Sequence, residues 1–331
     1  MATIKDVAKE AGVSVSTVSR VINNSGYVGA ETKLKVHKAM SKLNFRPSGV
    51  ARGLVSKTTK TIGLLIPDVS NPFYADVARG IEDSAIQNGF ATILCNFEWK
   101  IDREKMYLEK LRQMWVDGII LSGSRSKLED LIDLIGDVPF VVIDRRDNPI
   151  GGAVWMDNET GGKVATDHLL DIGCKKLVHL SGPSLSPSAI GRKKGFIRAI
   201  EEAKLRGLDI VGDVYQGDYR YEGGYNLGIK LLSSDNKPDG IFAANDIMAI
   251  GVIQAAQTLG ISIPNDLAVI GYDNIAMGEY IYPKLSTIDQ PAYIMGRTSF
   301  QMLSDIIASE KREHREIEFV PKLIVRQSTQ G

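Results

Sequence analysis

From residue 61 onward, short apolar segments alternate with amphipathic ones in two successive series, and this alternation constrains the fold more than any other feature. The first series contains "TIGLLIPD", "FATILCN", "VDGIILSG" and "VPFVVIDR", with helical patterns at 74–88 and 103–114. The second contains "KKLVHLSGP", "DIVGDVYQGD", "PDGIFAAND" and "DLAVIGYDN", with helical patterns at 161–171, 192–203 and 248–258. Continuous apolar runs are typical of strands buried in parallel sheets. We therefore expect an α/β fold with two doubly wound parallel sheets and right-handed crossovers.

Polar residues stand at the carboxyl ends of these apolar segments in both series. Ligands of parallel α/β sheets bind beyond the carboxyl ends of the strands, so these side chains are candidates for a binding site. A polar set repeated in two lobes predicts a ligand held in the cleft between them. The set comprises Asp68, Asn71, Ser122, Asp144, Arg145, Ser181, Asn245, Asp246 and Asp273.

Signatures of catalysis are missing from the sequence. No GxGxxG motif follows the first strand, and the "GGK" at 161–163 precedes Val164, where a phosphate-binding loop carries Ser or Thr. Neither HExxH nor GxSxG occurs, and none of the four His residues has a Ser or Cys partner in a triad context. We expect a binding protein that is not an enzyme and has no cofactor.

Cysteine usage and hydropathy limit the remaining classes. Cys95 and Cys174 are far apart and belong to no CxxC or Cys/His cluster, so neither a metal site nor a disulfide framework is expected. No apolar run reaches the roughly 18–20 residues that span a bilayer, and the N-terminus has no signal-peptide pattern. We expect a cytoplasmic protein.

The first 45 residues have the pattern of three short helices. Thr3 is placed to cap the first helix, with Asp6 at its third position, and Gly12 ends it. Ser14 is placed to cap the second helix. Its apolar residues recur at steps of three and four, as expected for one helix face: Val15, Val18, Val21 and Ile22. A third helix is expected at 31–43, with an inner face of Leu34, Val36, Ala39, Met40 and Leu43.

Charge separates this head from the rest of the chain. The whole protein carries 40 basic and 40 acidic side chains, but residues 1–60 hold eleven Lys and Arg against three Asp and Glu, a net of +8. A small basic unit on an acidic body favours a polyanion as the partner of the head. The segment "SGVARGLVSKTTKT" after Pro47 is short, basic and a weak helix former, and we interpret it as a linker that orders conditionally.

Several motifs resemble the lactose-repressor/galactose-repressor family of bacterial transcription regulators. The head "TIKDVAKEAGVSVSTVSRVIN", the segment "NFRPSGVARGL", the core opening "IGLLIPDVSNPFYADVARGIE", and "PNDLAVIGYDN" and "VRQST" near the end all match family patterns. The resemblance implies a helix-turn-helix head at 1–46, a hinge at 47–60, and two lobes of the periplasmic-binding-protein type. The first lobe would comprise 61–160 plus 292–322, and the second 161–291 plus 323–331.

The resemblance also implies how the head binds DNA. The second helix of a helix-turn-helix lies in the major groove, and small side chains let it approach the base edges. Val15, Ser16 and Thr17 would read bases, and Arg20 would bond a guanine in bidentate fashion. Leu54 of the hinge would wedge the central base step of a palindromic operator. The full DNA-binding set expected is Thr3, Ser14, Val15, Ser16, Thr17, Ser19, Arg20, Asn23, Ala51 and Leu54.

Paired hinge helices need two chains, so a homodimer is expected. The lactose repressor has an additional C-terminal leucine-heptad tail that makes tetramers. This sequence stops directly after "RQST", and we therefore expect a dimer only.

The core also resembles ribose-binding proteins, and their sugar contacts can be carried over one at a time. Carboxylates would accept from sugar hydroxyls, arginines would donate to the same oxygens, and aromatic faces would cover the C–H surfaces. The positions are Asn71, Phe73, Tyr74, Asp144, Arg145, Arg192, Tyr219, Asn245, Asp273 and Gln290. Trp155 and Arg125 are two further residues that could reach the cleft.

The function expected is that of a repressor controlled by ribose or a related aldose, with other possibilities open. Regulators with similar residues bind other sugars, sugar phosphates or purines. Others use a phosphorylated carrier protein as corepressor, and the "IDRR" segment argues against a carrier protein here. A sugar-binding protein without a DNA role is the alternative from another class. Whether the effector releases or tightens DNA binding is left open, because both occur on this scaffold.

Overall fold

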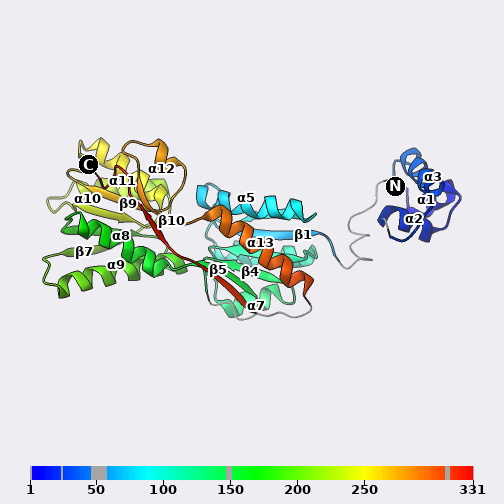
Figure 1. Cartoon of the computed structure of the whole chain (residues 1–331), viewed down its shortest axis with the longest axis horizontal. Helices are drawn as coiled ribbons and strands as arrows, with labels where there is room; N and C mark the ends of the chain where they lie inside the picture. Colours follow the sequence, from blue (N-terminus) through cyan, green and yellow to red (C-terminus); the bar gives the residue numbers. More distant parts are fainter. Residues whose placement is uncertain (1, 24, 46–57, 147–150, 310–313, 331) are drawn as a thin grey trace. The chain divides into compact units, whose positions relative to one another are not determined.

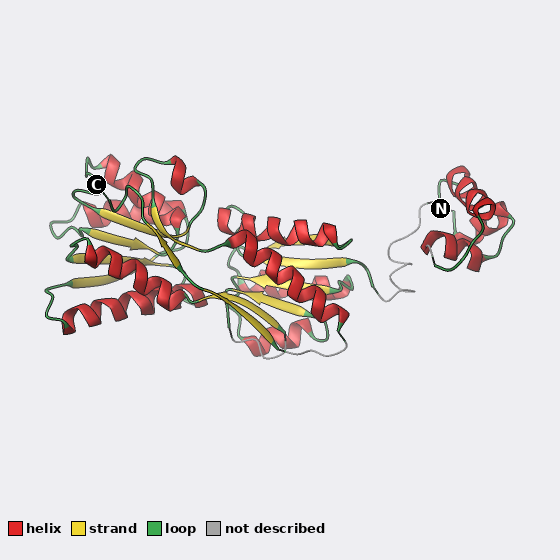
Figure 2. Ribbon diagram, viewed as in Figure 1, coloured by secondary structure: helices red, strands yellow, loops and turns green. Residues whose placement is uncertain are grey.

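The computed structural model describes residues 2–23, 25–45, 58–146, 151–309 and 314–330. Two compact units are present, Met1–Lys60 and Thr61–Gly331. Ala51 and Leu54, two of the expected DNA-binding residues, lie outside the described residues. Figure 1 follows the chain through both units, and Figure 2 shows an all-helical first unit and a core of alternating helices and strands.

The head consists of α1 (Ile4–Ala11), α2 (Val15–Asn23) and α3 (Ala30–Lys42). Thr3 and Asp6 form a capping box at the start of α1, and Gly12 ends the helix in a left-handed conformation (φ 66°). The Ser14 hydroxyl accepts from the Thr17 amide at 3.1 Å and so caps α2. The three predicted ends of these helices are therefore present.

The interior of the head is made of small aliphatic side chains. Its buried members are Val7, Ala8, Val18, Val21, Val36 and Ala39. Leu34, predicted for the inner face of α3, is 56% exposed, so that prediction was wrong. Residues two apart lie about 200° from each other around a helix, so Leu34 cannot share the inward face with Val36.

The first lobe of the core is built on a six-stranded parallel sheet with the order β11-β5-β4-β3-β1-β2. Its strands are β1 (Thr61–Ile66), β2 (Ala91–Asn96), β3 (Gly118–Ser122), β4 (Phe140–Ile143), β5 (Gly152–Met156) and β11 (Arg315–Phe319). Its helices are α5 (Pro72–Gln87), α6 (Ile101–Gln113), α7 (Leu128–Ile135) and α13 (Ala292–Ala308). The interior strands are buried on both faces, as their continuous apolar runs predict.

The second lobe has a six-stranded sheet with the order β12-β10-β9-β8-β6-β7, in which only β12 is antiparallel. Its strands are β6 (Lys176–Ser181), β7 (Val211–Gln216), β8 (Gly240–Ala243), β9 (Ala268–Asp273), β10 (Ser286–Asp289) and β12 (Lys322–Ile324). Its helices are α8 (Asn158–Asp171), α9 (Pro187–Leu205), α10 (Tyr221–Leu232), α11 (Asp246–Thr258) and α12 (Met277–Tyr280). The prediction of two doubly wound α/β lobes behind a helical head is confirmed.

The chain passes between the two sheets three times, after β5, after β10 and after β11. The lobe boundaries given by the resemblance stay predictions, but two of them cut through elements. The boundary after residue 160 falls inside α8, and Lys322 belongs to β12 of the second sheet. A continuous helix and a paired strand cannot be divided between lobes, which places these crossings nearer residue 157 and residues 320–321.

Close helix packing brings the first turn of α8 to the middle of α9. A side chain at Gly162 would collide with the backbone of Arg192, and one at Gly195 would collide with the backbone of α8. Glycine at both positions lets the two helices approach backbone to backbone. This approach places Asn158 beside the Arg192 side chain.

Candidate functional site

A small polar pocket lies where the carboxyl ends of the two sheets meet. Its lining comes from both lobes: Asn71, Phe73, Tyr74, Asp144, Ser188, Arg192, Tyr219, Asn245 and Asp273. Eight of the ten effector-binding residues expected from the sequence are among them. The location agrees with the rule that ligands of such sheets bind beyond the strand ends.

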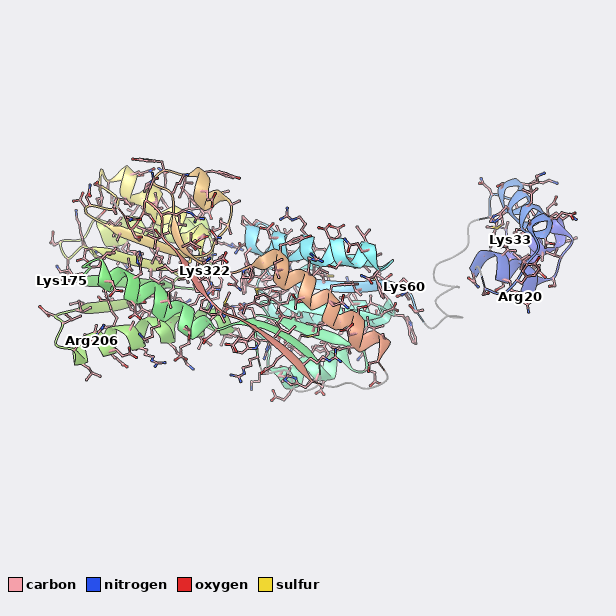
Figure 3. All side chains as sticks on the ribbon, viewed as in Figure 1. Arg20, Lys33, Lys60, Lys175, Arg206 and Lys322 are labelled. Atoms are coloured by element: carbon pink, nitrogen blue, oxygen red, sulfur yellow. The ribbon has the colours of Figure 1, made fainter. Side chains whose placement is uncertain are left out.

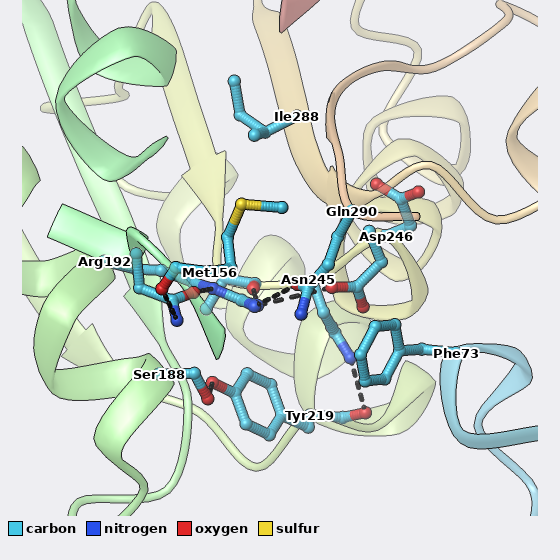
Figure 4. Close-up of polar contacts among 12 residues, drawn as sticks. Phe73, Met156, Ser188, Arg192, Tyr219, Asn245, Asp246, Ile288 and Gln290 are labelled. Carbon is cyan, nitrogen blue, oxygen red and sulfur yellow. Dashed lines mark hydrogen bonds and ion pairs between the residues drawn. The ribbon is translucent and has the colours of Figure 1, made fainter. Parts of the chain in front are cut away.

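Arg192 is the centre of the pocket's hydrogen-bond network (Figure 4). The side chain is 3% exposed, and its guanidinium contacts groups on four different segments. Nε donates to Asn158 Oδ1 at 2.8 Å, and Nη2 donates to Gln290 Oε1 at 2.8 Å. Nη1 donates to the Ala244 carbonyl and lies 3.5 Å from Asp273 Oδ1. The planar guanidinium group has five N–H donors and can bond several partners at once, which the ammonium group of a lysine cannot reproduce.

Two buried carboxylates face this guanidinium. Burial raises the pKa of Asp144 and raises that of Asp273 well above its usual value, while Arg192 opposes both shifts. Asp144 also accepts from Asn158 Nδ2 at 2.9 Å. Two carboxylates and one guanidinium leave the pocket with more acceptors than donors. A ligand rich in O–H donors compensates such a site better than an anion does.

Three residues of the pocket wall have left-handed backbone. Asp144, Tyr219 and Asp273 have φ values of 67°, 65° and 110°. A positive φ is uncommon for residues with a side chain, and such conformations concentrate at ligand sites. The Asn245 amide stabilises one of these turns, because its Nδ2 donates to the Tyr219 carbonyl at 3.1 Å.

Asn71 and Asn245 also act as helix caps. The Oδ1 of Asn71 accepts from the Phe73 amide at 3.0 Å, and the Oδ1 of Asn245 accepts from the Met248 amide at 2.9 Å. These caps start α5 and α11 two residues earlier than the apolar pattern predicts. Both the Oδ1 and the Nδ2 of Asn245 are hydrogen-bonded within the protein. The Nδ2 of Asn71 lines the pocket as a donor for a ligand oxygen.

Aromatic rings close the pocket from both lobes. Phe73 and Tyr74 at the start of α5 meet edge to face, with ring centroids 5.1 Å apart. Tyr219 comes from the second lobe, and its hydroxyl lies 3.3 Å from the Ser188 hydroxyl (Figure 4). Such rings cover the C–H faces of a sugar or the plane of a base.

Two of the expected effector residues do not line the pocket. Arg145 turns away from Asp144 and donates from Nη1 to the Ser126 carbonyl at 3.0 Å. Gln290 supports Arg192 and borders a neighbouring cavity of about 160 Å³. Trp155 is partly buried and packs against the interior of the first lobe, and Arg125 lies over Trp99 with its Cζ 5.7 Å from the ring centroid.

Sequence reasoning missed three residues at this site. Ser188 lines the pocket four residues before Arg192, a helical spacing that could have identified it. Asn158 bridges Asp144 and Arg192 from the start of α8. Trp99 contacts the rings of Tyr74 and Tyr219, with centroids 6.1 and 5.6 Å away. Nothing in the local sequence signals the last two.

The pocket has a volume of about 10 Å³, which is room for roughly one water molecule. A ligand of pentose size therefore enters only when the lobes separate or Arg192 changes its bonding.

The head presents a polar helix surface for contact with DNA. Val15 is 41% exposed, and Ser16 and Arg20 are exposed on the same short helix (Figure 3), whereas Val18 and Val21 are buried. The Thr3 and Ser14 hydroxyls are engaged in helix capping. The Ser19 hydroxyl accepts from Asn23 Nδ2 at 3.3 Å. Five of the polar DNA-binding residues expected from the sequence are exposed, namely Thr3, Ser14, Ser16, Arg20 and Asn23.

Comparison with known proteins supports the same division into head and core. A family described as "Bacterial regulatory proteins, lacI family" matches residues 3–48. A family described as "Periplasmic binding protein-like domain" matches residues 166–329.

The chain is 39% identical over 331 residues to the ribose operon repressor of Halalkalibacterium halodurans, covering 100% of this chain and 98% of that protein. The chain belongs to the lacI family of bacterial regulatory proteins. Its identity to the transcriptional repressor PurR of Photobacterium profundum is 38% over 333 residues, covering 99% of this chain and 98% of that protein. This lacI-family chain is therefore a transcriptional repressor with a DNA-binding head, as the sequence predicts.

Two solved structures bear on the two halves of this lacI-family protein. The lac repressor dimer bound to operator and an anti-inducer matches with a TM-score of 0.85 at 26% identity, covering 100% of this chain and 99% of that one. A lacI-family regulator of Enterococcus faecium with bound ribose matches with a TM-score of 0.72 at 34% identity, covering 81% and 98%.

The described part of the lacI-family chain contains neither a membrane-spanning helix nor a metal-binding cluster. None of its helices is both long and apolar enough to cross a membrane. Among the same residues, no three His, Cys, Asp or Glu side chains gather in a way that could hold a metal ion.

Proposed function

We propose that this repressor binds a pentose between its two core lobes, ribose or a close relative, and that this binding sets its affinity for operator DNA. The observation that carries the proposal is the joining of Asp144, Arg192 and Asp273 in one buried pocket with aromatic walls. Carboxylates accept from adjacent hydroxyls, and the guanidinium donates to the same oxygens, so the set recognises a polyol.

The composition of the pocket favours a neutral sugar over the other effectors of similar regulators. Two carboxyl groups and one guanidinium offer mostly acceptor oxygens, which disfavours the phosphate of a sugar phosphate. A purine would use the aromatic walls, but it lacks the adjacent hydroxyl groups that the two carboxyl groups can bind. The ribose operon repressor and the regulator with bound ribose add weight to the pentose.

We further propose that the active species is a cytoplasmic homodimer on a palindromic operator. Two heads related by a twofold axis bind two half-sites about one helical turn apart. The lac repressor, which matches over the whole chain, is a dimer on its operator. Base reading would fall to Val15, Ser16, Thr17 and Arg20, and the minor-groove role of Leu54 stays a prediction.

The test is calorimetry with a panel of D-ribose, D-xylose, D-xylulose, D-glucose, ribose 5-phosphate, hypoxanthine and guanine. The proposal expects a pentose to bind at least tenfold more tightly than the hexose, the phosphate and the purines. A ligand present at 100 times its dissociation constant would also stabilise the fold by about 2.7 kcal/mol, which a thermal-shift assay detects. Preferential binding of a purine or of ribose 5-phosphate would contradict the pentose assignment.

A further inference from the structure

Trp99 lies in the turn between β2 and α6 of the first lobe. Both Glu98 and Trp99 have left-handed backbone, with φ values of 52° and 57°. Side-chain-bearing residues adopt this conformation at a cost, so the turn needs support from its surroundings. The Glu98 carboxylate supplies it through ion pairs with Lys100 at 3.1 Å and Arg103 at 2.7 Å. The position of the indole is therefore fixed by the local chain.

The indole joins the two walls of the effector pocket. Trp99 is 7% exposed, and its ring centroid lies 6.1 Å from that of Tyr74 and 5.6 Å from that of Tyr219. Tyr74 belongs to the first lobe and Tyr219 to the second, and both line the pocket. Trp99 therefore contacts the pocket's aromatic wall at the point where the lobes meet.

One charged side chain also lies against the indole. The Arg125 guanidinium lies over the ring, with its Cζ 5.7 Å from the centroid. The neighbouring Ser124 hydroxyl donates to the buried carboxylate of Glu104 at 2.9 Å. The indole Nε1 is buried, and no hydrogen-bond partner is found for it in the described part of the chain. The buried Nε1 of Trp155 is likewise without a partner in the described residues, so the position of Trp99 between Tyr74 and Tyr219 is what distinguishes it.

We propose that Trp99 sets the upper size limit of the effector. The inference rests on the pentose pocket of the proposed function and adds a residue that determines its specificity. Once the pocket opens enough to admit one sugar ring beside Tyr74 and Tyr219, a second ring attached at that end would meet the indole. Removing the indole leaves a space of aromatic size bounded by the two tyrosines and Arg125. The flat base of a nucleoside suits such a space, because it stacks on rings and on a guanidinium.

The test compares binding of D-ribose and of adenosine, which is ribose extended by a base, in the full-length protein. We expect Trp99→Ala to bind adenosine at least tenfold more tightly than the wild type does, and Trp99→Phe to show a smaller gain. Trp155→Ala is the matched control, since Trp155 is a partly buried tryptophan of the first lobe that lies outside the pocket, and no gain is expected. Adenosine affinity in Trp99→Ala within twofold of the wild type would overturn the proposal, as would a wild type that binds adenosine as tightly as ribose.

Two further measurements keep the result interpretable. Circular dichroism reports whether Trp99→Ala folds. If it does not, Trp99→Phe decides by the same adenosine criterion. Trp99→Phe should also lose most of the ribose-induced change in tryptophan emission, because Trp115 is 76% exposed and Trp155 lies outside the pocket. Failure of the wild type to bind any pentose would refute the proposed function, whereas the size limit is decided by adenosine binding in the variant.

Discussion

Arg192 Nη1 lies 3.5 Å from Asp273 Oδ1, and both side chains are buried at the carboxyl edge of the second sheet. The same guanidinium donates to Gln290, which directly precedes α13 of the first lobe. A ligand that competes for Asp273 or for Arg192 therefore acts on a segment where the chain passes between the lobes. This arrangement gives a direct physical route from effector binding to lobe movement.

Arg192→Lys should weaken pentose binding strongly while keeping the positive charge. A lysine cannot donate to Asn158, Ala244 and Gln290 at once, and breaking a buried charged hydrogen bond costs roughly 1.5–3 kcal/mol. We expect the dissociation constant, measured by calorimetry, to rise about 10–100-fold. Arg145→Lys is the control, because this buried arginine lies outside the pocket, and its pentose affinity should stay within about twofold of the wild type. Equal losses of pentose affinity in the two variants would show that Arg192 has no special role in pentose binding.

Asp273→Asn should abolish the response to effector and leave DNA recognition intact. The substitution keeps the shape of the side chain but replaces one acceptor oxygen with an NH₂ group, which cannot accept from ligand hydroxyls. We expect pentose affinity to fall by at least about tenfold and operator affinity without ligand to be unchanged in a fluorescence anisotropy titration. The exposed Asp213→Asn serves as the charge-matched control. A variant that still binds pentose and still switches would contradict the assigned site.

The sequence predicts the alternation of strands and helices well, because continuous apolar runs and amphipathic periods report burial directly. The sequence identifies only some of the residues that form the pocket. Asp144 and Arg145 both follow the same strand, but only Asp144 reaches the pocket, and the local sequence does not signal its left-handed backbone (φ 67°). Trp99 depends on a left-handed turn of non-glycine residues, for which local composition gives no signal. Asn158 depends on the close approach of α8 and α9, which is a property of tertiary packing.

Asp246 should make folding stability depend on pH. Burial raises the pKa of this carboxyl from 3.8 to about 7, although hydrogen bonds from Thr287 and the Ile275 amide oppose the shift. The folded state thus holds the proton more tightly than the unfolded state does. Its stabilising contribution is complete below pH 3.8, falls by roughly 1.4 kcal/mol per unit as pH rises toward 7, and is constant above.

Asp246→Asn removes the titrating carboxyl group and so tests whether Asp246 causes this pH dependence. Thermal unfolding from pH 4.5 to 8 should show the wild-type Tm declining relative to that of Asp246→Asn, since other titrating groups are common to both proteins. Parallel Tm curves across this range would show that Asp246 stays ionised in the folded protein.

Arg20→Ala should relax sequence preference at one base pair of the operator. Arg20 is exposed on α2, and a bidentate contact with guanine contributes roughly 1–3 kcal/mol of discrimination. The measurement is binding to the preferred operator and to its single-base variants at one salt concentration. Lys38→Ala removes a charge from the exposed surface of α3 and should leave the ranking of operator variants unchanged. An unaltered ranking in Arg20→Ala would exclude Arg20 from base reading.

The central claim is that pentose binding between the lobes controls operator affinity. The most direct measurement is an anisotropy titration of a palindromic duplex, selected with this protein from a random library, with and without saturating D-ribose. The account predicts that ribose changes the operator dissociation constant by about 5–150-fold in one direction, and that Asp273→Asn abolishes the change. Identical operator affinity with and without ribose, under conditions where calorimetry shows ribose bound, would contradict it.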